Sequence, residues 1–159
     1  MVAKALSSNY ETIVIFPNKN SSLFKDYCQE NELEYRRVPL TGLTKDLVAL
    51  IRYVLLFPFE IVRLIQSIKK LKVDLIHNSG GAWQIKGILA AKLSRTKVLW
   101  HLNDTYMPFI VRVTFFLLNN AADGFIYASQ RTKDYYSPLV NRKKKSFVIQ
   151  APVDTDYFN

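Results

Sequence analysis

Short β-type runs alternate with helical patterns along the whole of this 159-residue chain. The β-type runs are expected at residues 12–16, 34–38, 73–77, 97–100, 124–127 and 146–149, and the helical patterns at 22–31, 45–71, 83–93, 108–119 and 131–136. Strands that alternate with helices predict βαβ units, in which helices cover both faces of a parallel sheet. No repeat, low-complexity tract or internal linker interrupts the pattern. We therefore expect residues 1–159 to form one α/β domain, a doubly wound and mostly parallel sheet.

Polar residues follow almost every predicted strand, at the edge where ligands bind in open α/β sheets. His77 and His101, the only two histidines, each follow directly on an apolar run and stand 24 positions apart. That spacing suits a strand–helix–strand unit with both imidazoles on one edge of the sheet. Loops of any α/β domain are polar, so the pattern is only suggestive. The other candidate binding residues are Asn78, Ser79, Gly80, Gly81, Asn103, Asp104, Ser129 and Arg131.

His101 is the stronger of the two histidines because Asn103 and Asp104 follow it closely. A histidine beside an acid can hold one tautomer and exchange a hydrogen bond with a sugar hydroxyl or a phosphate. The alternative is that Asn103 or Asp104 only caps the next helix. For His77 the structural interpretation is favoured, since it ends its predicted strand and could simply close the turn.

Ser79, Gly80 and Gly81 precede the helix that is expected to begin near Trp83. Glycines there allow close backbone approach, and free N–H groups suit a phosphate or a carboxylate, although a plain helix cap explains the same residues. No lysine completes a Walker motif, and Gly-x-Ser-x-Gly is absent. No third His, Cys or acid stands at a metal-like spacing, so we expect no metal and no cofactor.

The chain is strongly basic, with a formal net charge of +9. Its Lys and Arg residues cluster at 36–37, 69–72 and 142–145, which favours anionic partners such as nucleotide phosphates or acidic lipid headgroups. Solvated helix ends and loops explain any single cluster better. Aromatic residues lie within apolar runs instead of between basic residues, so we expect no nucleic acid as a partner.

Two predicted helices are apolar on nearly all sides, at residues 47–59 and 108–119. A core position explains such a helix, and contact with a bilayer or a lipid-linked substrate is the functional alternative. The first ends at Pro58-Phe59, where the proline should kink or divide the helix, and a polar stripe that includes Glu60 and Arg63 follows. Neither stretch reaches the roughly 20 apolar residues of a spanning helix. Together with a single cysteine and no secretory signal, this favours a cytoplasmic protein that is soluble or peripheral on the inner face of a membrane.

Several segments, in order, resemble the N-terminal domain of glycosyltransferase family 4. They are Asp74-Leu75-Ile76-His77, the helix at 85–93, Val98-Leu99-Trp100-His101, the segment 122–129 that ends in Ser129, and the closing segment 148–158. In the closing segment the family usually carries Asn-Gly where this chain has Ala151-Pro152.

The resemblance implies a Rossmann-like domain of the GT-B fold, whose active site lies in a cleft against a second, donor-binding domain. The activity implied is retaining transfer of a sugar from a nucleotide-sugar, without a metal, to a glycan or lipid-linked acceptor. His101 would contact the transferred sugar. Asn78 to Gly81, with Asn103 and Asp104, would line the acceptor side.

The chain also departs from the family. The donor domain and the opening strand with its glycine-rich turn are not in this sequence, and Met1–Leu6 matches the end of the helix that would follow that strand. We therefore expect a fragment or split gene product that ends at the interdomain segment near 151–159, with poor activity alone. A separate donor-domain protein would complete it. The alternative is a non-catalytic, membrane-associated partner subunit that recruits an acceptor or a donor-domain protein.

Overall fold

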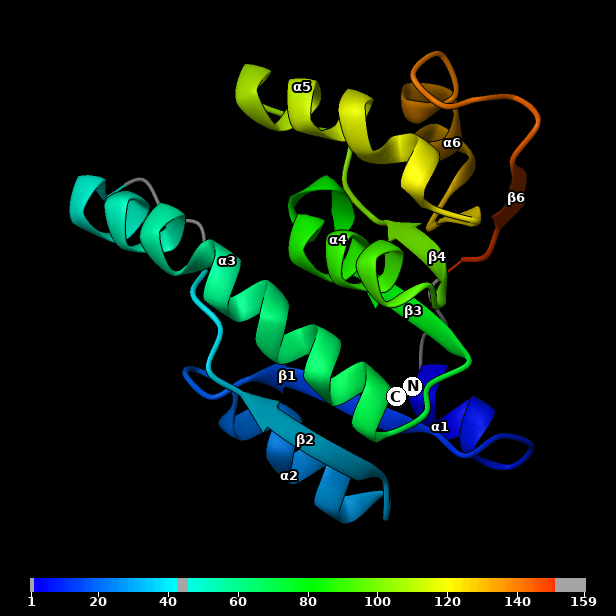
Figure 1. Ribbon diagram of the computed structural model, residues 1–159. Coiled ribbons are helices and arrows are strands. Elements are labelled where there is room, and N and C mark those ends of the chain that lie inside the picture. The colour runs from blue at the N-terminus through cyan, green and yellow to red at the C-terminus, as the bar shows by residue number, and fades with distance from the viewer. Residues whose placement is uncertain (1, 43–45, 151–159) are drawn as a thin grey trace, which may run out of the picture. The chain divides into compact units, whose positions relative to one another are not determined.

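The computed structural model describes residues 2–42 and 46–150, and its contacts divide the chain into two units, residues 1–60 and 61–159. The closing segment near 151–159 lies outside the described residues. The helices and strands alternate as the sequence predicts, in parallel sheets flanked by helices (Figure 1).

The first unit holds α1 (Val2–Ser7), β1 (Ile13–Pro17), α2 (Ser22–Glu30), β2 (Glu34–Val38) and the beginning of α3 (Leu47–Lys70). β1 and β2 pair in parallel, with Ile13 opposite Glu34. The core of this unit is small. Its main cluster consists of Phe16, Cys28 and Leu33, with partly buried neighbours, and Val38 and Tyr53 are buried elsewhere in the unit.

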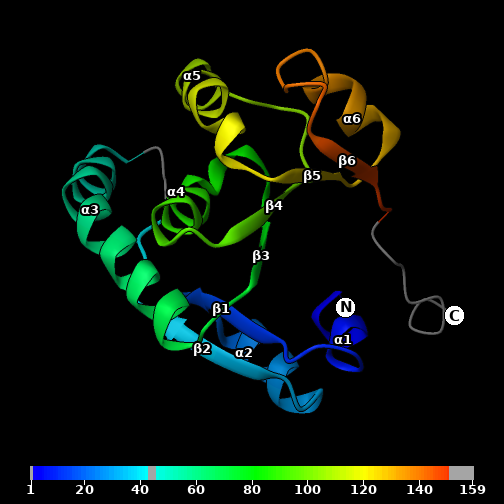
Figure 2. The ribbon, with the colours of Figure 1, turned by 45° about the vertical axis from the view of Figure 1, so that its right-hand side comes forward.

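The second unit is built on four parallel strands in the order β3-β4-β5-β6 (Figure 2). The strands are β3 (Leu75–Ser79), β4 (Lys97–Leu102), β5 (Gly124–Tyr127) and β6 (Lys145–Val148). The connecting elements are η1 (Gly81–Trp83), α4 (Ile85–Ser94), α5 (Phe109–Leu118), η2 (Asn119–Ala121) and α6 (Gln130–Tyr136).

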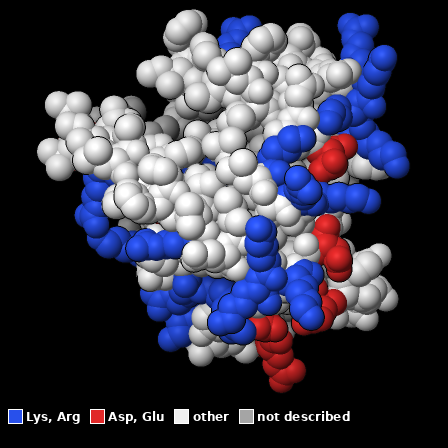
Figure 3. Space-filling view, viewed as in Figure 1, with Lys and Arg blue, Asp and Glu red and all other residues white. Residues whose placement is uncertain are grey.

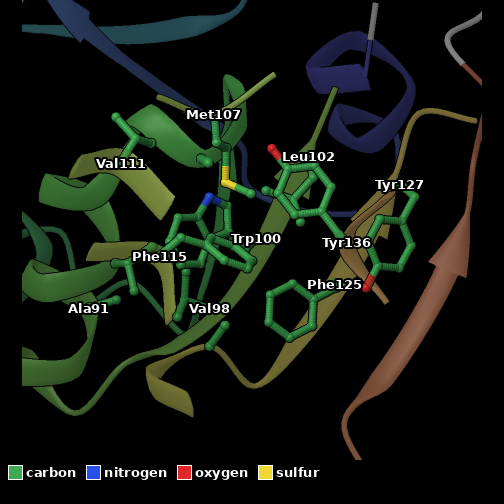
Figure 4. Close-up of a cluster of buried hydrophobic side chains, with 13 residues drawn as sticks. Ala91, Val98, Trp100, Leu102, Met107, Val111, Phe115, Phe125, Tyr127 and Tyr136 are labelled. Carbon is green, nitrogen blue, oxygen red and sulfur yellow. The ribbon is translucent and has the colours of Figure 1, made fainter. Parts of the chain in front are cut away.

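One face of this sheet carries the main core (Figure 4). Alternate residues of β4, namely Val98, Trp100 and Leu102, point to that face and are fully buried. Helices α4, α5 and α6 all contribute to the same cluster, with Ile88, Phe115 and Tyr136 among the buried side chains. Because side chains alternate along a strand, the residues between these core positions lie on the opposite face.

Two expectations about α3 are corrected. The helix runs from Leu47 to Lys70 as one element, so Pro58 does not divide it; a proline removes only one donor from the helix. Glu60, expected on a polar stripe, is only 1% exposed. Its carboxylate accepts hydrogen bonds from the backbone N–H (2.8 Å) and the hydroxyl (3.2 Å) of Thr41, which explains why a charged residue is buried there.

Candidate functional site

The two histidines lie side by side on one face of the second unit's sheet. Strands β3 and β4 both end two residues later than the sequence predicts, so His77 is in the middle of β3 and His101 is the next-to-last residue of β4. Ser79 is paired with His101, which places His77 two residues back on the same face. Nε2 of His77 lies 3.1 Å from Nδ1 of His101, and the rings stack with centroids 5.1 Å apart. The expectation that His77 ends its strand and closes a turn is therefore wrong.

Burial lowers the pKa of both imidazoles below the ordinary value of 6.5. For His77 the neighbouring His101 lowers the pKa further, because two adjacent positive charges would repel. Both rings are consequently neutral at pH 7, so one donates and the other accepts in the bond between them. Nε2 of His101 is buried and, among the described residues, has no hydrogen-bond partner.

The glycine turn after β3 is packed against the loop after β4. Gly80 (φ 123°) and Gly81 (φ 77°) both adopt backbone conformations that favour glycine. A Cβ on Gly81 would collide with the carboxylate of Asp104 and would lie 3.1 Å from the side-chain oxygen of Asn103. The carbonyl of Gly81 accepts a 2.9 Å hydrogen bond from Nε1 of Trp100. The close approach that the sequence suggested is thus made, in this structure, by the chain's own loop.

Asp104 is engaged by Tyr136, which sequence reasoning missed. The Tyr136 hydroxyl donates to Oδ1 of Asp104 across 32 positions of sequence. Burial, then the hydrogen bond to the Asp104 carboxylate, raise the pKa of Tyr136, while a backbone hydrogen bond from Ala82 acts in the opposite direction. Asp104 therefore ties the loop after β4 to α6. The side chain that bonds to the ring of His101 is His77. No spacing in the sequence indicates a pairing over such a distance.

The remaining candidates are divided between this edge and other positions. Asn78 lies within β3 opposite Trp100, on the core face, and its Nδ2 donates to the carbonyl of Gln84 (2.9 Å). Ser79 is the exposed last residue of β3. Ser129 caps α6 by accepting from the N–H of Thr132 (3.1 Å), and Arg131 is exposed in the first turn of that helix.

The edge of the sheet therefore brings together Gly80 and Gly81 of the glycine turn with Asn103 and Asp104. His101 precedes this loop in β4, with its ring on the face of the sheet opposite Trp100. The N–H of Ala128 donates to the carbonyl of Leu102 (3.0 Å), so Ser129 follows immediately beside the same loop. Backbone turns, a carboxylate, an amide and a neutral imidazole can exchange hydrogen bonds with a polyhydroxylated ligand.

Some residues of the basic clusters bond to other parts of the chain instead of only facing solvent. In the last of them Lys144 donates from Nζ to the carbonyls of Asn120 (3.1 Å) and Ala122 (2.7 Å) and so secures the turn before β5. Arg36 in the first cluster pairs with Glu34 at 2.7 Å. Figure 3 shows that Lys and Arg outnumber Asp and Glu on the face in view.

Parallel strands joined by helices, with polar loops gathered at the strand ends, define a Rossmann-like domain of the kind that binds its ligand at the sheet edge. Residues 1–157 match the sequence model of the family Glycosyltransferase Family 4. The chain belongs to this family and corresponds to its N-terminal domain. In the described part of the chain, β1, β2, β3 and β6 each have one side without a strand partner.

Solved GT-B glycosyltransferases have the same fold. HepE from Anabaena, solved with UDP and glucose, is 14% identical with a TM-score of 0.66 and matches 98% of this chain over 41% of its own. A glycosyltransferase from Rickettsia africae is 19% identical with a TM-score of 0.69, and 99% of this chain covers 39% of it. MurG from Acinetobacter baumannii is 21% identical with a TM-score of 0.59, and 96% of this chain covers 41% of it. This chain therefore spans about 40% of the length of these relatives. No curated protein matches the sequence.

Proposed function

We propose that this chain is the acceptor-side part of a retaining glycosyltransferase, which moves a sugar from a nucleotide-sugar to a glycan or lipid-linked acceptor. The observation that carries the proposal is the packing of the glycine turn against the Asn103–Asp104 loop, which directly follows the strand of His101, at one sheet edge of a family 4 domain. HepE has been solved with UDP and with UDP-glucose, which supports a nucleotide-sugar as the donor.

In this proposal the bond between the sugar's anomeric carbon and the nucleotide phosphate breaks, and the acceptor hydroxyl oxygen forms the new bond to that carbon. The hydroxyl proton leaves with the phosphate side of the reaction. His101 contacts the transferred sugar through its ring, and Asn103 orients the acceptor by hydrogen bonds. The donor's nucleotide is held by a second domain from a separate protein or a further part of the same one.

The test is to mix the chain with a separately expressed donor domain of the family and to measure transfer of labelled sugar from a panel of nucleotide-sugars. We expect His101→Ala to reduce transfer by roughly 100-fold or more, as for other residues that contact the reacting group. Lys92→Ala, an exposed position on α4, serves as the control and keeps full transfer. Unchanged transfer by His101→Ala would remove the role assigned to this residue.

The second candidate is a non-catalytic subunit that recruits an acceptor or a donor-domain protein to an anionic membrane. It is favoured by the apolar side chains that α5 exposes, which are Phe109, Ile110, Val113, Phe116 and Leu117. Arg112 is the one charged residue of this helix, so its exposed face carries no acidic side chain that would repel a lipid phosphate. Within the described residues, no helix has both the length and the hydropathy to cross a bilayer.

Sedimentation with vesicles distinguishes this second candidate. Binding to vesicles that contain phosphatidylglycerol, lost in Phe116→Ser/Leu117→Ser and kept in Leu93→Ser, would support membrane recruitment. Leu93 is a matched control because it is an exposed leucine on α4. Equal sedimentation of the wild-type chain, Phe116→Ser/Leu117→Ser and Leu93→Ser would count against recruitment through α5.

A further inference from the structure

His77 is the group that the structure adds to the candidate site. His77 is not part of the polar loops at the sheet edge, because it lies in the middle of β3. Nε2 of His77 is nevertheless 3.1 Å from Nδ1 of His101. The other ring nitrogen of His101, its Nε2, does not take part in this contact. The two atoms of His101 that can carry a proton therefore have different surroundings, since one meets His77 and the other is buried without a partner in the described residues.

The hydrogen bond between two neutral imidazoles allows two proton arrangements. If His77 donates, His101 must carry its own proton on Nε2, which leaves a buried N–H without an acceptor. If His101 donates from Nδ1, its Nε2 is a bare acceptor. Buried donors without partners are rarer in proteins than acceptors without partners, so the second arrangement is favoured while no ligand is bound.

We propose that His77 is a positioning residue that accepts the Nδ1–H of His101 and thereby leaves Nε2 of His101 free to accept a hydrogen bond from a hydroxyl of the transferred sugar. The role toward the sugar rests on the proposed function, whereas the hydrogen bond and the tautomer are properties of this chain alone. The stacked arrangement of the rings, with an interplanar angle of 19°, also restricts rotation of His101.

The tautomer can be read by nitrogen-15 NMR of the intact chain near pH 7.5. Only two histidines are present, so His77 variants leave His101 as the single imidazole. We expect His101 to carry its proton on Nδ1 in the wild-type chain and to keep it there in His77→Gln, whose amide oxygen can accept in place of Nε2. In His77→Phe, which preserves a ring but no acceptor, we expect the proton to redistribute between the two nitrogens. Circular dichroism of both variants establishes that they are folded.

Two results would overturn the proposal. One is a wild-type His101 protonated on Nε2, and the other is a His101 tautomer that is the same in His77→Phe and His77→Gln. If His77→Phe fails to fold, the wild-type and His77→Gln spectra still decide between the two proton arrangements.

A kinetic measurement in the assembly with a donor domain tests the consequence for transfer. We expect His77→Phe to lower kcat by roughly 10- to 100-fold, as for a misplaced catalytic group, with little change in KM for the nucleotide-sugar. His77→Gln should restore most of kcat, which a merely space-filling role would not predict. Equal kcat values for the two variants would contradict positioning. Absence of transfer by the wild-type assembly would instead count against the proposed function, with the tautomer result still in support of the hydrogen bond.

Discussion

Gly81 occupies a position where any other residue would be strained. Its φ of 77° lies in the region that favours glycine, and a Cβ would also lie 2.8 Å from Cγ of Asp104. We expect Gly81→Ala to lower the free energy of unfolding by at least about 1–3 kcal/mol from the backbone conformation alone, with the collision adding to it. Urea unfolding measures this change.

Gly42→Ala is the matched control for this substitution. A Cβ at Gly42 would have no neighbour within 4 Å among the described residues. We expect its effect to stay within about 0.5 kcal/mol, as for ordinary surface positions. Similar losses for Gly42→Ala and Gly81→Ala would mean that the contact with Asp104 does not constrain the turn.

The paired histidines make stability depend on pH. Their pKa values are lowered in the folded chain, so below pH 6.5 the unfolded chain binds more protons than the folded one. The stabilisation is complete above about pH 6.5 and is lost as the pH falls toward the folded pKa values. We expect the free energy of unfolding to decrease between pH 7 and pH 5.

The double variant His77→Gln/His101→Gln, which has no imidazole, isolates this effect. Its free energy of unfolding should change less over the same pH interval than that of the wild-type chain. A parallel pH dependence in both proteins would assign the loss of stability to other groups.

At the level of single residues, the sequence predicts which residues gather but not which of them bond. The order of strands is enough to place His101, Asn103 and Asp104 near one sheet edge, whereas His77 lies in the middle of β3. The bond from Tyr136 to Asp104 depends on the orientation of α6, and the bond between the histidines depends on how far β3 and β4 extend. Neither quantity is encoded in local spacing.

Helix α5 shows how one element divides its apolar residues. Phe115 is fully buried against Trp100, with ring centroids 4.9 Å apart, whereas the adjacent Phe116 is 63% exposed. We expect Phe115→Ala to lower the free energy of unfolding by about 3–5 kcal/mol because it leaves a cavity in the main core.

Phe116→Ala is the control within the same helix. The same atoms are removed from a mostly exposed side chain, so its loss should stay below about 1 kcal/mol. Comparable losses for the two substitutions in urea unfolding would mean that the outer face of α5 is also covered.

At the level of elements, the predicted strands and helices match the structure closely because their patterns are strong. β2 and β5 have the predicted bounds, and β1 and β6 are displaced by one residue. The sequence could not show that α5 is half exposed, because all-round apolar composition hides which face packs. It also could not show that Glu60 is buried, since that depends on Thr41 from a distant loop.

The two units of the chain have cores of very different size. Among the described residues, the core cluster of the first unit holds three buried residues, Phe16, Cys28 and Leu33, while that of the second holds thirteen. Because hydrophobic burial is the main stabilising term, we expect the first unit to open at a lower urea concentration than the second.

The chain carries a separate reporter in each unit. Cys28, its only cysteine, is buried in the first unit, and both tryptophans, Trp83 and Trp100, are in the second. Reaction of the Cys28 thiol should therefore rise at lower urea than the change in tryptophan fluorescence. Coincident midpoints for the two signals would show that the units unfold as one.

In residues 2–42 and 46–150, no strand pairs with one side of β3, and this affects how the molecule behaves in concentrated solution. A row of backbone N–H and C=O groups without a neighbouring strand is a template for a strand of another molecule. Leu75, at the start of β3, is more than half exposed and adds apolar surface beside that row. We expect edge-to-edge aggregation to rise with protein concentration, and a strand added along β3 would suppress it.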